Sequence, residues 1–136
     1  MADQQQALQR VSDVLVPGGR FAFCCVHGMP KVIRSLCQAL GSEGDALLSS
    51  LHFTPREQWL AYFESAGFKV IQTDEVSDYH FESINDVMCW WEATTHGVFA
   101  RDRLSSSQLD DLCDHYPGAI DIYREETLRL VAIKKA

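Results

Sequence analysis

His27 is the residue whose position along the chain best suits it to act on a small molecule. It directly follows a short apolar run from Phe21 to Val26. That run predicts a strand, and open α/β sheets bind ligands beyond the carboxyl ends of their strands. An imidazole placed there could orient a substrate or serve as a base. The alternative interpretation is a solvated loop histidine.

A second candidate group combines aromatic and polar side chains near the end of an expected helix. Its members are Trp90, Trp91, Thr95 and His96. Aromatic rings line ligand pockets, but they also pack in cores, so composition leaves both roles open. Adjacent residues cannot share one helical face, so we expect one tryptophan to point away from the core. His96 also suits a helix C-terminus, where the macrodipole favours positive charge.

Cysteine and acidic residues give weaker indications of chemistry. The five cysteines are an odd number without Cys-x-x-Cys spacing, which predicts free and mostly buried thiols. Cys24 and Cys25 are adjacent on a predicted strand, so they should face opposite ways. The acidic run Asp110, Asp111 and Asp114 lacks the glycine and spacing of a calcium loop, and a solvated helix face is expected. No metal site is predicted.

The elements that must position these residues alternate between helix and strand. Apolar spacing predicts helices over residues 3–15, 31–40 and 84–97, a short helix capped within Ser105 to Ser107, and a turn over residues 41–45. Thr54 and Glu57 have the spacing of a capping box for a helix that ends at Gly67. Residues 68–76 predict a strand that continues towards Phe81. Residues 119–134 predict one long or bent strand. Phe21 to Val26 is continuously apolar, as in strands covered on both faces.

Size and charge restrict the class of protein. The chain has 136 residues, 46% of them hydrophobic, which predicts a single domain over residues 1–136. A net charge of -7 with only 12 Lys and Arg gives no basic face for nucleic acid or membrane lipid. No apolar run approaches the roughly 20 residues of a membrane span, and the start lacks signal-peptide features. We expect a soluble cytoplasmic protein.

Two sequence patterns resemble class I S-adenosylmethionine-dependent methyltransferases. "LVPGGRFAF" (residues 15–23) resembles the entry to the fifth strand of that family, and "FTPREQWLAYFESAGFKV" (residues 53–70) resembles the segment after that strand. The resemblance covers essentially the whole chain. It implies an α/β fold with part of a Rossmann-like sheet and flanking helices. Phe21 to Val26, Phe68 to Val76 and Leu128 to Ile133 would be strands five, six and seven, the last antiparallel between the other two.

A more particular resemblance concerns the acceptor. "WWEATTHGVFARDRLSSSQLDDL" (residues 90–112) is similar to malonyl carrier-protein O-methyltransferases, in which this region belongs to a lid over the substrate. His52 stands where that group has a basic residue for the substrate carboxylate, a departure from the pattern. The resemblance therefore implies a small carboxylate or acyl-type acceptor. The predicted substrate-binding residues are His27, His52, Trp90, Trp91, Thr95 and His96.

The family's cofactor site lies upstream of the part that this chain resembles. We therefore expect the chain alone to bind no cofactor, with S-adenosylmethionine bound only if a cofactor-binding half completes the fold. Strand four would also be missing, leaving the edge of Phe21 to Val26 unpaired. That edge is expected to pair with a second copy or with a separate cofactor-binding half. A non-catalytic homodimeric binding module and a truncated product without activity are the alternatives to a methyltransferase half.

Overall fold

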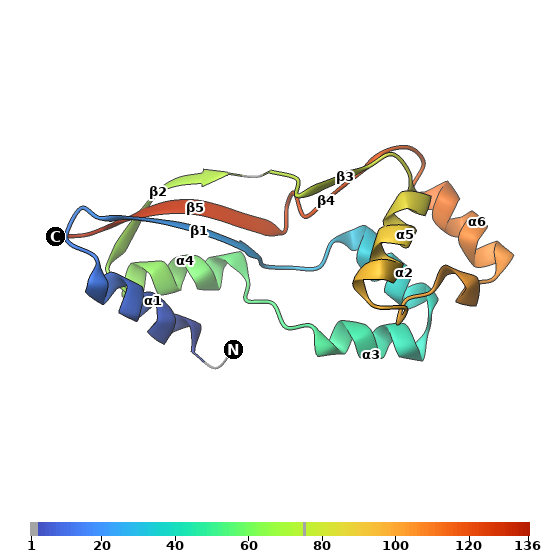
Figure 1. Cartoon of the computed structure of the whole chain (residues 1–136), viewed down its shortest axis with the longest axis horizontal. Coiled ribbons are helices and arrows are strands. Elements are labelled where there is room, and N and C mark those ends of the chain that lie inside the picture. The colour runs from blue at the N-terminus through green and yellow to red at the C-terminus, as the bar shows by residue number, and fades with distance from the viewer. Residues whose placement is uncertain (1–2, 75) are drawn as a thin grey trace. The chain divides into compact units, whose positions relative to one another are not determined.

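A computed structural model describes residues 3–74 and 76–136 (Figure 1). The described chain forms two compact units. The sheet unit comprises the described residues of Met1–Gly28, Phe53–Val76 and Glu126–Ala136. The helical unit comprises Met29–His52 and Ser77–Glu125. The helical unit is thus made of two segments, each inserted into the chain of the sheet unit.

The sheet unit contains three strands, β1 (Arg20–Val26), β2 (Phe68–Asp74) and β5 (Thr127–Lys134). Their order is β1-β5-β2, and β5 is antiparallel to both neighbours. β1 and β2 therefore run parallel to each other without touching. The expected order, with residues 128–133 antiparallel between the other two strands, is observed. A bulge between Val70 and Gln72 interrupts the pairing of β2.

Helices α1 (Gln4–Val14) and α4 (Arg56–Ser65) cover one face of this sheet, as Figure 1 shows. Phe63 is fully buried there and its ring contacts those of Phe21, Phe23 and Phe68, with centroids 5.2 to 6.0 Å apart. The exposure of β1 alternates, with Ala22 and Cys24 exposed. The prediction that this strand is covered on both faces is therefore wrong for this chain. Its residues on the open face are small rather than polar, which makes the run look continuously buried.

The start of α4 differs from the predicted capping box. Pro55 is the N-cap and no side chain caps the helix. The Thr54 hydroxyl instead donates to the Gln4 side-chain oxygen, 2.5 Å away. The prediction for the end of the helix is confirmed, since Gly67 has a φ of +84° and follows the C-cap residue Ala66.

The helical unit contains α2 (Lys31–Ala39), α3 (Ser42–Ser50), α5 (Ile84–Thr94), α6 (Ser106–His115) and the 3-10 turn η1 (Arg101–Arg103). Its core includes the fully buried Ile33, Leu36, Val87, Met88 and Phe99. The turn predicted over residues 41–45 is wrong, because α3 begins at Ser42. Glycine and serine disfavour a helix in this segment. The helix nevertheless forms, with Gly44 buried against the backbone of Cys37 in α2.

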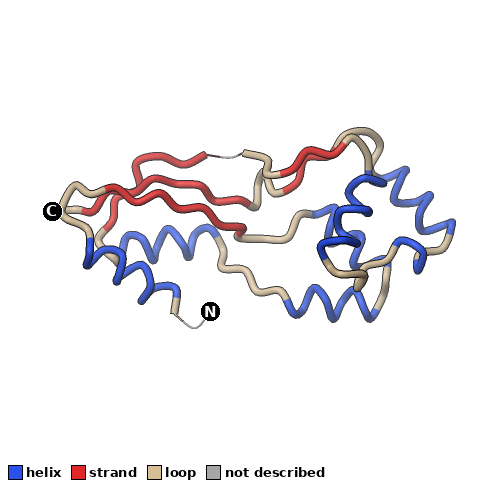
Figure 2. Tube along the Cα trace, viewed as in Figure 1, coloured by secondary structure: helices blue, strands red, loops and turns tan. Residues whose placement is uncertain are grey.

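The remaining strands, β3 (Tyr79–Phe81) and β4 (Ile120–Ile122), form a separate antiparallel ladder in the helical unit (Figure 2). The predicted strand over residues 68–76 ends at Asp74, and Glu75 lies outside the described residues. The expected continuation of that strand towards Phe81 is the separate strand β3, which belongs to the helical unit. The strand predicted over residues 119–134 is also divided, into β4 and β5. Tyr123 has a φ of +63°, which ends β4 and sends the chain back to the sheet unit.

The described fold is thus mixed α/β, with small antiparallel sheets and flanking helices. Within residues 3–74 and 76–136, no helix combines the length and the apolar character needed to cross a membrane.

Candidate functional site

Trp90 is the centre of an aromatic cluster in the helical unit. Its ring lies 5.1 Å from Tyr79, 5.6 Å from Phe81 and 6.4 Å from Tyr123, measured between centroids. We call Tyr79, Phe81, Trp90 and Tyr123 the aromatic cluster. Trp90 is half-buried and Tyr79 is 46% exposed. The rings are tilted against one another and partly exposed, and they combine apolar area with phenol groups, which suits an apolar or acyl ligand.

Trp91 takes the other side of the helix, as expected for adjacent residues. It is 5% exposed and packs in the core with Val87, Met88 and Phe99. Its indole Nε1 is buried without a hydrogen-bond partner among the described residues. Burial raises the pKa of the neighbouring Cys37 thiol. Trp91 therefore supports the cluster from behind, with its ring 5.6 Å from that of Trp90.

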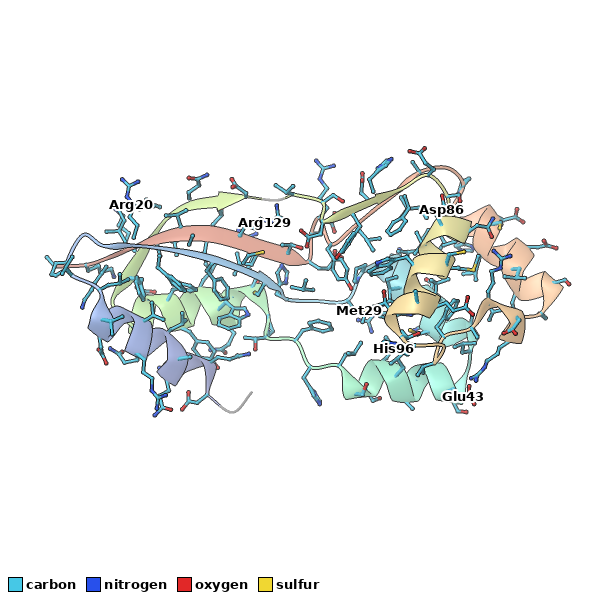
Figure 3. The ribbon with its side chains drawn as sticks, viewed as in Figure 1. Arg20, Met29, Glu43, Asp86, His96 and Arg129 are labelled. Atoms are coloured by element: carbon cyan, nitrogen blue, oxygen red, sulfur yellow. The ribbon has the colours of Figure 1, made fainter. Side chains whose placement is uncertain are left out.

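Thr95 and His96 close the end of α5. The N–H of His96 donates to the Ala93 carbonyl, and the N–H of Gly97 donates to the Glu92 carbonyl. This is the Schellman arrangement, in which the residue after the C-cap is left-handed. His96 occupies that position with a φ of +52°, and its side chain is exposed (Figure 3). The interpretation of His96 as a helix-terminal residue is therefore supported by the backbone.

Thr95 has a positioning role in the same turn. Its hydroxyl donates to the Trp91 carbonyl, 2.9 Å away, and accepts the N–H of Phe99, 3.0 Å away. These bonds satisfy the hydroxyl within the protein. Thr95 therefore anchors the buried Phe99 beneath α5, and its oxygen has little capacity left for a ligand.

Sequence reasoning predicted only Trp90 of this cluster and missed Tyr79, Phe81 and Tyr123. The left-handed φ of Tyr123 is a costly conformation for a bulky residue, about 1–3 kcal/mol. In this conformation the Tyr123 ring lies in the cluster, 6.2 Å from Tyr79. Strained residues concentrate at functional sites. The alternation of Tyr79 and Phe81 could have indicated one face of a strand, and the tyrosine-containing final segment is part of the family resemblance, but local spacing does not single out Tyr123.

His27 lies in the sheet unit, directly after β1. Its N–H donates to the Glu126 carbonyl, 2.6 Å away, which extends the ladder by one residue. The ring is half-buried, and its Nε2 is buried without a partner among the residues that the structure describes. A buried imidazole nitrogen without a partner is costly and calls for an explanation. The predicted role of His27 in orienting a substrate remains a prediction.

The six predicted site residues divide between the two units. Trp90, Trp91, Thr95 and His96 come together around the end of α5, whereas His27 belongs to the sheet unit. His52 ends the first segment of the helical unit and is exposed. Its predicted contact with a substrate carboxylate remains a prediction.

A charged group on the ladder between β3 and β4 is a further feature that sequence reasoning missed. His80 Nδ1 lies 2.8 Å from Asp121 Oδ1, and its Nε2 lies 3.3 Å from Glu82 Oε1. The hydrogen bond with Asp121 raises the pKa of His80 and lowers the pKa of Asp121. All three side chains are exposed, so we regard the group as a surface ion pair across β3 and β4.

Metal chemistry and thiol chemistry find little support. Within the described ranges, no three His, Cys, Asp or Glu residues are grouped to hold a metal ion. The five cysteines are free thiols, as predicted. Only Cys37 is buried, however, so the expectation that most are buried is wrong. Burial raises the pKa of the half-buried Cys25 to about 11, with a smaller contribution from Cys24.

Comparisons with known proteins add no identification. Neither the scan against protein-family models nor the search of curated proteins finds a match.

Proposed function

We propose that this chain is the substrate-side part of an S-adenosylmethionine-dependent methyltransferase acting on a small carboxylate or acyl-type acceptor. The observation that carries the proposal is the position of β5, antiparallel between two strands that run parallel to each other. The resemblance implies this order for the same three segments. Topology alone does not fix a function, so the proposal also depends on the aromatic cluster.

The strand order is informative because it is not the arrangement that chain connectivity favours. Parallel strands joined by helical crossovers commonly lie side by side. Here β1 and β2 are separated by the width of one strand. β5, which comes later in the chain, lies between them and pairs with both, with Arg20 of β1 opposite Ile133. Only a sheet built around a late antiparallel strand has this order.

The aromatic cluster would hold the apolar part of the acceptor. Tyr79, Trp90 and Tyr123 combine an apolar surface with phenol groups, so an acyl chain could lie on the rings while its polar end stays hydrated or hydrogen-bonded. Trp91 and the Thr95 turn fix the helix that carries Trp90. A rigid support is what positioning of an acceptor requires.

The cofactor would be held outside this chain. Among the described residues, no strand runs into a glycine-rich turn that could cradle a nucleoside. We therefore derive no step of methyl transfer from these residues. S-adenosylmethionine would be bound by a cofactor-binding segment, whether in the same polypeptide or a separate one.

The edge of β1 is where that segment would join. The N–H of His27 points to β5, so by alternation the peptide groups of Ala22, Cys24 and Val26 point to the open edge. β2 at the opposite edge is protected by its bulge and by its charged side chains. β1 carries no charge after Arg20 and no bulge. Its edge therefore favours association, with the cofactor-binding segment as the proposed partner and a second copy as the alternative.

Ligand titration tests the proposal. Hexanoate and octanoate are expected to change the tryptophan fluorescence of the purified chain at millimolar concentration, octanoate more tightly because it buries more CH₂ groups. Trp90→Phe should lower the affinity for octanoate, whereas Trp59→Phe in the sheet unit should leave that affinity unchanged. An absence of saturable binding, or equal loss in both variants, would refute the acceptor role of the cluster.

Calorimetry tests whether this chain binds the cofactor by itself, and light scattering tests whether it is a dimer. S-adenosylmethionine should give no binding heat with this chain alone, since the cofactor is assigned to another segment. Micromolar binding would overturn that assignment. A stable dimer that binds octanoate without S-adenosylmethionine would favour the homodimeric binding module over the methyltransferase half.

A further inference from the structure

A polar groove separates α2 from α6 in the helical unit, and no member of the aromatic cluster lines it. It has a volume of about 270 Å³. Its polar lining consists of Ser35, Gln38, Gln108, Asp111, His115 and Tyr116. Leu112 and Ala39 supply its apolar part. The groove is open to solvent, with Gln38, Asp111 and His115 exposed.

Hydrogen bonds hold one wall of the groove in place. The Ser35 hydroxyl donates to the Lys31 carbonyl, 3.1 Å away. The Ser35 and Tyr116 hydroxyls also share a 2.7 Å hydrogen bond in which either oxygen can be the donor. Tyr116 Oη keeps a lone pair and can accept from a ligand. This wall is ordered before any ligand arrives.

Gln108 is fixed in the same way. Its Oε1 accepts the N–H of Ser105, 2.8 Å away, and its Nε2 donates to the Ala39 carbonyl, 3.0 Å away. Both bonds define the orientation of the amide. One N–H of Nε2 remains, so Gln108 can offer a single donor to the groove.

The charge of the groove selects among small polar ligands. Asp111 is the only Asp, Glu, Lys or Arg among the residues that line it. Asp110 and Asp114 on the same helix are exposed and add to the negative potential. A cation beside Asp111 could also lie near the Tyr116 ring. An anion in the groove would be repelled by the Asp111 carboxylate.

We propose that this groove binds a small organic ammonium ion that also carries a hydroxyl group. The ammonium would donate to the Asp111 carboxylate, and the hydroxyl would bond with Tyr116 Oη or the Gln108 amide. The volume of the groove lies just below the range of sites for drug-sized molecules, which matches a ligand of a few heavy atoms. The groove is built from residues of the helical unit alone, so its proposed ligand does not depend on the proposed methyltransferase function.

Three probes of nearly equal size separate charge from shape. Ethanolamine, ethylene glycol and glycolate are titrated into the ¹⁵N-labelled chain, and amide shifts are followed. Ethanolamine should produce saturable shifts at Ser35, Gln38, Leu112 and Tyr116 in the millimolar range. Ethylene glycol should bind about tenfold more weakly, since a hydrogen bond to a charged group is worth roughly 1.5 kcal/mol or more. Glycolate should not bind there.

Two aspartate variants control the result. Asp111→Asn should reduce the affinity for ethanolamine to that for ethylene glycol, while Asp110→Asn on the same helix, which does not line the groove, should leave the affinity within twofold. Both side chains are exposed, and an otherwise unchanged amide spectrum verifies the fold. Equal affinity for ethanolamine and ethylene glycol, or equal effects of the two variants, would overturn the proposal.

Discussion

Replacing Gly44 with alanine should destabilise the protein, against the expectation from helix propensity. Gly44 lies in the first turn of α3, where α3 packs on α2. A Cβ at this position would lie 1.6 Å from the Cys37 carbonyl oxygen and 2.5 Å from its carbonyl carbon. These are backbone atoms that no change of rotamer can move. The two helices would therefore have to separate.

The magnitude of the destabilisation depends on two opposing contributions. Alanine in place of glycine within a helix stabilises by about 0.5–1 kcal/mol. Overpacking typically costs about 1–3 kcal/mol, and a backbone overlap that side chains cannot relieve belongs at or above the upper end. We expect Gly44→Ala to lower the free energy of unfolding by about 2 kcal/mol or more. For a chain of this size that corresponds to a melting temperature roughly 6–10 °C lower.

Thermal and urea unfolding followed by circular dichroism measure this change. Ala46→Gly in the same helix is the matched control, because Ala46 is exposed and its replacement tests propensity alone. That control should lose about 1 kcal/mol. If Gly44→Ala were as stable as the parent chain or more stable, the close approach of α2 and α3 would be wrong.

Charge, capping and thiol reactivity can each be tested in the same chain. Because the pKa of His80 is raised, its bond with Asp121 stabilises the folded state below pH 6.5, and this stabilisation is lost as the pH rises through the raised pKa. Because the pKa of Asp121 is lowered, the same bond is also lost when acid protonates that carboxyl. His80→Gln should flatten urea midpoints measured across that window; an unchanged pH profile would contradict the pair. Ser105→Ala should cost about 1 kcal/mol because it removes a capping box, with near-equal midpoints as the contrary result. Ellman's reagent at pH 8 should titrate the exposed thiols quickly and Cys25 and Cys37 slowly; fast reaction of all five would refute the burial pattern.

Of two predicted N-terminal helix caps, one is confirmed and one is wrong. The serines from Ser105 predict a helix cap, and the structure completes a capping box between Ser105 and Gln108. The spacing of Thr54 and Glu57 is equally suggestive, but Pro55 takes the N-cap position and Thr54 bonds to Gln4, a residue 50 positions away. Local spacing identifies the start of a helix, whereas the partner of a hydroxyl depends on distant parts of the chain.

The failures have the same cause. Glycine and serine residues predict a turn where α3 forms, because its packing on α2 is not visible in local sequence. Partial alternation on both sides of Tyr123 predicts one long or bent tail strand, since the left-handed backbone that separates β4 from β5 carries no signal in the local spacing. The candidate site is predictable only in part. Trp90 stands out in the sequence, but the rings of Tyr79, Phe81 and Tyr123 reach it only through tertiary structure.

The central position of β5 also sets the order of events during synthesis. β1 and β2 each find their only sheet partner among the described residues in β5, so neither can pair within this chain until residues 127–134 leave the ribosome. The segments of the helical unit are complete earlier, at Glu125. Nascent chains fold in units as these become available, from the N-terminus onward. The growing chain therefore carries β1 and β2 without their β5 partner until residues 127–134 emerge, so the three-stranded sheet is the last part of the described fold to form.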